Sequence, residues 1–224
     1  MNKPLTLAGE RDNRIVATRQ AAVAYAEFTH STAKYPSVVP AAVNAKFLYV
    51  VIGLANEVGE LAELFDQEAV NDGGRMERYA KAWKELGDVQ WYAARITVEM
   101  PELKSFAEMV YDAIYELKNG PKRELRLSGY DLQSALCAYS GRVLGVVKKM
   151  MRDGDTWSEE KRAEKMAELQ EFLTKVVAVS VEFAEKTGPL VGCSGGYVHL
   201  LRCNSDKLAD RKDRGVLHGD GGAR

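Results

Sequence analysis

Cysteine is scarce in this chain of 224 residues, which contains only Cys137, Cys193 and Cys203. Their number is odd, and no two of them form a Cys-x-x-Cys pair. Proteins held together by disulfides carry cysteines in larger, even numbers, and disulfides persist in oxidising compartments. The cysteine content therefore argues against a disulfide framework and predicts a cytoplasmic protein.

Long apolar runs and an excess of one charge are also missing. No apolar stretch approaches the roughly 18 residues of a membrane-spanning helix, and residues 1–14 lack the apolar segment of a secretory signal. The 31 basic and 32 acidic side chains leave a formal net charge of −1, which gives no general attraction for nucleic acid or anionic membranes. We therefore expect a soluble protein with neither a nucleic acid nor a membrane as partner, and any phosphate recognition must be local.

Proline is rare as well, with six residues, whereas apolar residues make up 46% of the chain and recur at helical spacing. Polar and glycine-rich breakers such as Asn71–Gly74 separate these stretches, and Ser158 is placed to cap a helix. The predicted helices cover about residues 14–28, 41–68, 76–99, 103–117, 130–151, 158–186 and 197–214. No strand is predicted. Long helices joined by short turns are typical of an all-α antiparallel bundle.

The chain also shows a sign of internal duplication. Residues 48–100 and 136–186 share the plan of a long helix, an Asp-Gly turn and a second long helix. Aligning the two copies places four acidic residues of the first, Glu57, Glu60, Glu85 and Asp88, opposite Tyr139, Arg142, Glu168 and Glu171. The second copy would thus keep one carboxylate pair and replace the other. The alternative is that any two helical hairpins look alike when aligned permissively.

Glu57 and Glu60 lie in the second predicted helix, on a stripe of apolar residues. Residues three and four apart share a helix face, which places Glu57 beside Leu54 and Leu61. A carboxylate on a buried face costs several kcal/mol unless it is paired or bound to a metal. No lysine or arginine lies within one turn of either glutamate on this helix. Because close carboxylates raise one another's pKa and a divalent cation removes that penalty, the pair predicts a metal site.

Glu85 and Asp88 form a second carboxylate pair, in the third predicted helix. Taken alone, this pair is also explained by solvated ion pairs with Lys81 and Lys84, four residues before each acid. If the two helices form a hairpin, however, both pairs converge. Four carboxylates make an all-oxygen cage that suits Mg²⁺ or Mn²⁺. Such a cage commonly receives substrate phosphates and activates a water molecule.

Two other kinds of metal site fit the sequence poorly. A helical di-iron site needs a histidine three residues after a glutamate, and none of His30, His199 and His218 has that spacing. A zinc site could use Cys193, His199 and Cys203, but their spacing matches no common zinc finger and a fourth ligand is missing. The oxygen cage therefore remains the metal site that the sequence favours.

The residues around both acidic pairs resemble a known signature. The chain reads GLANEVGEL at 53–61 and KELGDVQWY at 84–92. This pattern closely resembles the ExxE and ExxD motifs of the MazG-like, all-α NTP pyrophosphohydrolases, since small and apolar residues match along with the acids. A later stretch, NSDKLADR at 204–211, resembles the N-x-x-K-L-x-x-R segment that follows the helices in MazG-like proteins, including phage-encoded ones.

The resemblance implies a magnesium-dependent nucleotide pyrophosphohydrolase. Its catalytic residues and its ligands for Mg²⁺, which Mn²⁺ could replace, would be Glu57, Glu60, Glu85 and Asp88. Water would attack a phosphorus of an NTP or dNTP, releasing NMP or dNMP and diphosphate. The substrate-binding residues would be Tyr92, Trp91, Asn204, Lys207 and Arg211. Two alternatives stay open: the tryptophans Trp91 and Trp83 can belong to the core instead of stacking on a base, and the basic helix can simply be solvated.

The second half of the chain departs from the family pattern. MazG-like proteins commonly assemble dimers or tetramers from one short bundle, whereas here the suspected second copy lies between the matching stretches. The resemblance therefore implies a pseudo-dimer within one chain, with one intact and one degenerate site, and it leaves a homodimer open. The domains would be 1–120, the MazG-like catalytic half; 121–187, the degenerate half; and 188–224, a glycine-rich loop, a basic helix and a flexible tail. A phage-encoded member would work in the cytoplasm of its host.

Two functions from other classes remain as alternatives. A non-catalytic helical protein that senses nucleotides would keep the bundle and bind its ligand without turnover. A nucleic-acid-binding protein would use the basic helix at 197–214. In that helix Asp206, Asp210 and Asp213 offset the basic residues, so a continuous phosphate-binding stripe is not expected.

Overall fold

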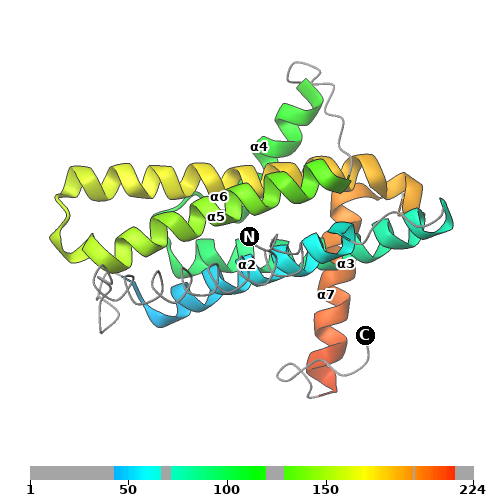
Figure 1. Ribbon diagram of the computed structural model, residues 1–224, viewed down its shortest axis with the longest axis horizontal. Coiled ribbons are helices and arrows are strands. Elements are labelled where there is room, and N and C mark those ends of the chain that lie inside the picture. Colours follow the sequence, from blue (N-terminus) through cyan, green and yellow to red (C-terminus); the bar gives the residue numbers. More distant parts are fainter. Residues whose placement is uncertain (1–42, 67–71, 120–128, 194, 215–224) are drawn as a thin grey trace, which may run out of the picture. The chain divides into compact units, whose positions relative to one another are not determined.

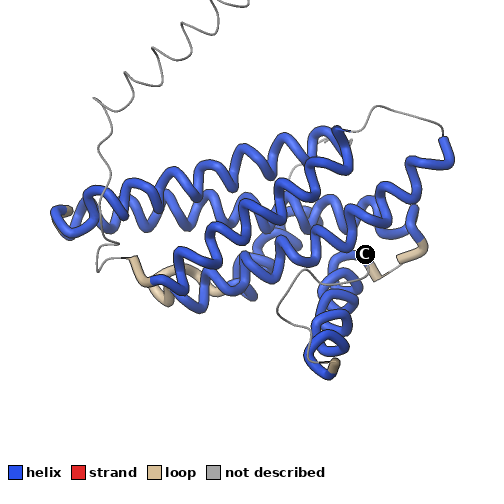
Figure 2. Tube along the Cα trace, turned by 60° about the horizontal axis from the view of Figure 1, so that its bottom comes forward, coloured by secondary structure: helices blue, strands red, loops and turns tan. Residues whose placement is uncertain are grey.

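The computed structural model of the chain describes residues 43–66, 72–119, 129–193 and 195–214. All of them belong to one of the two compact units of the chain, residues 39–224. Six α-helices follow one another along these residues, which contain no strand (Figures 1 and 2). The helices are α2 (Ala45–Asp66), α3 (Asp72–Glu99), α4 (Phe106–Asn119), α5 (Gly129–Asp153), α6 (Glu159–Thr187) and α7 (Gly196–Asp213). Two short 3-10 helices, η1 (Gly154–Thr156) and η2 (Gly188–Val191), flank α6. The predicted all-α fold is confirmed.

The predicted helix ends agree with the structure to within a few residues, and the starts of α2 and α3 differ most. Helix α2 begins at Ala45 instead of residue 41. Helix α3 begins at Asp72, inside the predicted breaker Asn71–Gly74, so that Gly73 and Gly74 belong to its first turn. Each glycine costs roughly 1 kcal/mol relative to alanine in a helix, and the packing of the rest of this 28-residue helix outweighs that cost. The N-cap predicted at Ser158 is confirmed, because its side chain accepts a hydrogen bond from the backbone N–H of Lys161 at 3.2 Å. The helix predicted at 14–28 lies outside the described residues.

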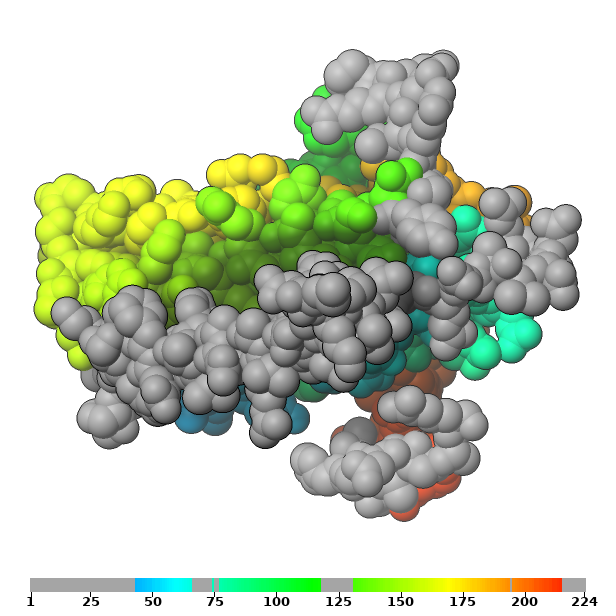
Figure 3. Space-filling model, in the orientation of Figure 1, coloured from blue at the N-terminus to red at the C-terminus, as the bar shows by residue number. Residues whose placement is uncertain are grey.

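The helices pack as two hairpins with two further helices against them. Helices α2 and α3 contact each other along one hairpin, and α5 and α6 form the other. Figure 3 shows α5 and α6, in yellow-green and yellow, side by side on one face of the molecule. The hairpins meet through α2 and α5, whereas α4 packs on α6 and α7 on both α3 and α6. Because consecutive long helices joined by short connections run in opposite directions, this arrangement is the predicted antiparallel bundle.

The core follows from the helical spacing of apolar residues on these faces. Fully burying one such side chain contributes about 1.5–3 kcal/mol. The large side chains that are fully buried include Phe47, Leu54, Leu61, Leu86, Ile96, Leu136, Leu169 and Phe183. No helix within the described ranges is long and apolar enough to cross a membrane.

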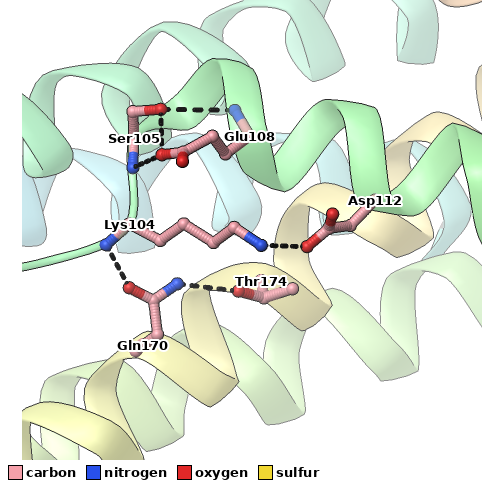
Figure 4. A network of polar contacts seen from close by, with 6 residues as sticks. All are labelled: Lys104, Ser105, Glu108, Asp112, Gln170 and Thr174. Carbon is pink, nitrogen blue, oxygen red and sulfur yellow. Dashed lines mark hydrogen bonds and ion pairs between the residues drawn. The ribbon is translucent and has the colours of Figure 1, made fainter.

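Helix α4 is fixed at its start by polar contacts, which Figure 4 shows. The Ser105 hydroxyl accepts from the Glu108 backbone N–H at 3.3 Å, while the Glu108 carboxylate accepts from the Ser105 N–H at 3.0 Å, a reciprocal capping box. The backbone N–H of Lys104 donates to the side-chain oxygen of Gln170 on α6, and the Lys104 ammonium pairs with Asp112. These contacts determine where α4 begins and hold its start against α6.

Helix α7 is anchored at its first turn. The buried Tyr197 donates from its hydroxyl to the side-chain oxygen of Gln90 on α3 at 2.6 Å. Its backbone N–H donates to the Glu185 carboxylate on α6 at 2.9 Å. Gly196 has a φ of 52°, and a Cβ built there would lie 2.5 Å from a Glu185 oxygen, so this turn requires glycine. Tyr197, Leu200 and Asn204 are all buried and lie on one face, which lays α7 across α3 (Figure 1).

Candidate metal centre

Three of the predicted ligands converge between α2 and α3. One carboxylate oxygen from each of Glu57, Glu85 and Asp88 lies within 4.8 Å of the other two. All three residues are half-buried. The cluster arises because Leu54 and Leu61, which flank Glu57 on its helix face, are fully buried and turn that face toward the hairpin partner. Within the described residues, this is the one place where three metal-ligating side chains come so close.

Glu60, the fourth predicted ligand, lies outside this group. Its carboxylate accepts a hydrogen bond from the Asn56 side-chain amide, one turn earlier on α2, at 2.9 Å. Glu60 is nevertheless close enough to raise the pKa of Glu57 by its negative charge. The structure thus brings three of the four acids together and places the fourth beside them.

The pKa of Glu57 is raised by its burial and by the other acids. Burial, followed by the charges of Asp88, Glu60 and Glu85, raises the pKa of Glu57 from 4.5 to about 7, against a smaller opposing effect of Lys207. The sequence predicted this direction from the stripe on which Glu57 lies. A carboxyl group with such a pKa is about half protonated at neutral pH when no cation is bound. A divalent cation that coordinates the cluster would bring the group back to its ionised form.

Two residues of helix α7 contact Asp88, one of the three acids of the cluster. The Asn204 side-chain amide donates to Oδ1 of Asp88 at 2.8 Å, and the Lys207 ammonium donates to Oδ2 at 2.5 Å. The motif resemblance predicted Asn204, Lys207 and Arg211 as substrate-binding residues; it did not predict that the first two contact a predicted metal ligand. Arg211 lies one turn farther along α7, and its side chain forms no hydrogen bond or ion pair with another described residue.

Two glycines of the motifs make the site geometrically feasible. A Cβ built at Gly87 would lie 2.9 Å from the Cβ of Asn204, so only glycine lets α7 approach α3 next to Asp88. A Cβ built at Gly53 would lie 2.2 Å from the ring of Tyr92, which therefore packs directly on the α2 backbone, one turn before Glu57. These close approaches explain why small residues accompany the acids in the sequence pattern.

No protein-family model, curated protein or solved structure matches this chain.

Tyr92 lies near the cluster, and two further aromatic side chains lie against Tyr92. Tyr92 is hydrogen-bonded to Tyr49, and burial, Tyr49 and the charges of Glu57 and Asp88 raise the pKa of Tyr92 to about 12. Trp91 packs edge-on against Tyr92, with ring centroids 4.8 Å apart, and remains 39% exposed. Trp91 is thus accessible for stacking. Tyr49 was missed in the sequence, because an exposed tyrosine early in a helix carries no distinctive pattern.

Trp83, the other tryptophan considered for stacking, belongs to the core. Its side chain is 6% exposed, and its indole N–H donates to the Thr187 hydroxyl at 2.9 Å. The cysteine and histidine grouping near it forms no metal cluster within the described residues. Only Cys203 and His199 meet there, with 3.2 Å between sulfur and Nε2.

The second hairpin lacks a comparable cluster at the aligned positions. Arg142 approaches Glu168 at 3.3 Å, and Lys175 approaches Glu171 at 2.5 Å. Lys175 also lies over the ring of Tyr139, 5.6 Å from its centroid. Cations on the same hairpin therefore balance the two carboxylates that the alignment placed opposite Glu85 and Asp88. The duplication and the domain boundaries stay predictions.

Proposed function

We propose that this protein is a Mg²⁺-dependent, MazG-like nucleoside triphosphate pyrophosphohydrolase. The observation that carries the proposal is the convergence of Glu57, Glu85 and Asp88 on one point, with Glu57 buried enough to raise its pKa to about 7. The donor set fits the proposed ion, because Mg²⁺ and Mn²⁺ prefer carboxylate oxygens and no histidine or cysteine takes part in the cluster. The motif resemblance supplies the reaction class.

In this proposal the three carboxylates hold Mg²⁺, and Glu60 completes the set by turning away from Asn56. The bound ion would polarise the phosphate and favour ionisation of the attacking water. The rest of the site orients the substrate. Asn204 holds Oδ1 of Asp88, so that this carboxylate keeps one orientation.

The nucleotide would lie between the aromatic side of the site and α7. Trp91, exposed beside Tyr92, offers a face for a base. On α7, Lys207 and Arg211 lie one turn apart on one face and offer two positive charges to the phosphates. The product would be a nucleoside monophosphate and diphosphate.

The test is diphosphate release from a panel of NTPs and dNTPs with Mg²⁺, comparing the wild type with Glu57→Gln and Glu171→Gln. Glu57→Gln keeps the shape of the side chain and removes its charge, and we expect a loss of about 100-fold or more. Glu171→Gln removes the same charge from the second hairpin, where Lys175 balances it, and should leave the rate nearly unchanged. Nucleotide binding without release of diphosphate from any substrate would favour a nucleotide sensor and overturn the enzymatic proposal.

A further inference from the structure

Both oxygens of Asp88 are engaged by α7. Asn204 donates to Oδ1, and the Lys207 ammonium lies 2.5 Å from Oδ2. Asp88 is also one of the three residues whose carboxylate oxygens lie within 4.8 Å of one another. The ammonium of Lys207 is therefore at the edge of the position that a cation bound by the cluster would take.

The charge of Lys207 is not confined to Asp88. Lys207 is also close enough to Glu57 for its positive charge to act on that carboxylate. A divalent cation would have the same effect with twice the charge. Because the ammonium and the metal ion are both positive and would share one carboxylate, they repel each other at this distance.

The fold allows Lys207 to leave Asp88 at little cost in packing. None of residues 205–214 is buried, whereas α7 is anchored upstream by Tyr197, Leu200 and Asn204. The lysine side chain is long and has many rotamers. Its ammonium can thus move away from Asp88 while the buried half of α7 stays on α3.

We propose that Lys207 is a built-in counter-ion of the carboxylate cluster, which competes with the divalent cation and sets its affinity. When the cation binds, it takes over Oδ2 of Asp88 and releases the Lys207 ammonium. This inference rests on the proposed function, since it requires a divalent cation at these carboxylates, and it adds a regulation of that site. Free Mg²⁺ must break the ion pair, whereas a metal–triphosphate complex offers the released ammonium a new anionic partner.

The experiment titrates the full chain with Mn²⁺ alone, by calorimetry, in the absence of nucleotide. Lys207→Met removes the charge and keeps most of the side-chain length, and Lys207→Arg retains the charge. Lys212→Met is the matched control, because Lys212 lies on the same helix, is exposed and loses the same charge. We expect Lys207→Met to bind Mn²⁺ at least about fivefold more tightly than the wild type, and the other two variants to stay within about twofold.

The outcomes separate this inference from the proposed function. Equal or weaker Mn²⁺ binding by Lys207→Met, with clear binding by the wild type, overturns the competition and leaves the metal site intact. Tighter binding by Lys212→Met to the same extent also overturns it, because the effect would then come from net charge. If neither the wild type nor Lys207→Met binds Mn²⁺, both the metal site and the inference fail. Circular dichroism of each variant verifies that the helices are retained.

Discussion

The raised pKa of Glu57 predicts that the metal-free protein loses stability as the pH rises. In the unfolded chain Glu57 titrates near its ordinary pKa of 4.5, and in the folded protein its pKa is about 7. Between these values the folded state binds more protons than the unfolded state. The free energy of unfolding therefore falls as the pH increases through this window, and the contribution of Glu57 is greatest below pH 4.5.

The size of the effect follows from the same two values. A difference between 4.5 and about 7 corresponds to an upper limit of roughly 3.4 kcal/mol, at about 1.4 kcal/mol per pKa unit. Glu57 is only half-buried, so solvent screens its interactions and the real effect is smaller. We expect the wild type to lose about 1–2 kcal/mol between pH 5 and pH 8 through this one group.

Urea unfolding at several pH values, in the presence of a chelator, measures this loss. Glu57→Gln resembles the protonated acid, so it should match the wild type at pH 5 and exceed its stability at pH 8. Glu63→Gln, an exposed position on the same helix, is the control and should follow the wild type throughout. Saturating Mg²⁺ at pH 8 should stabilise the wild type and not Glu57→Gln. Equal pH dependence in the wild type and Glu57→Gln would refute the reasoning.

Two further predictions concern the stability of individual helices, α2 and α6. Gly59→Ala should stabilise α2 by up to about 1 kcal/mol, because nothing lies near the added Cβ. Gly53→Ala must displace the Tyr92 ring, so this variant should be at least about 1 kcal/mol less stable than Gly59→Ala. Thermal unfolding of the two variants decides this, and equal stabilities would contradict the close contact. Ser158→Ala should lower the free energy of unfolding by about 1 kcal/mol, because it removes the side chain that accepts from the Lys161 N–H, and Ser158→Asp should restore that stability. An unchanged stability of Ser158→Ala would show that this cap is dispensable.

The fold was predictable because helical spacing of apolar residues is a local property of the sequence. The helices within the described residues were placed to within a few residues of their ends, and Ser158 was identified as a cap. The start of α3 was misplaced because glycine propensity is a local preference, which the packing of a long helix overrides. Glu57 was identified for a similarly local reason, since a charge between Leu54 and Leu61 on a buried face needs a partner.

The parts of the site that sequence reasoning missed depend on distant segments. The contacts of Asn204 and Lys207 with Asp88 require α7 to cross α3 at Gly87, more than a hundred residues earlier, and no local pattern specifies that crossing. The hydrogen bond between Glu60 and Asn56 depends on a choice of rotamer, which motif spacing does not contain.

The docking of α7 on Asp88 also bears on how the protein matures. During synthesis α2 and α3 emerge long before Asn204 and Lys207, so the nascent hairpin holds its acids close together without the basic helix that later shields them. A chain that stops before α7 thus lacks both Asp88 partners, and the carboxylate cluster is assembled in its final form only in a molecule translated to the end of this helix.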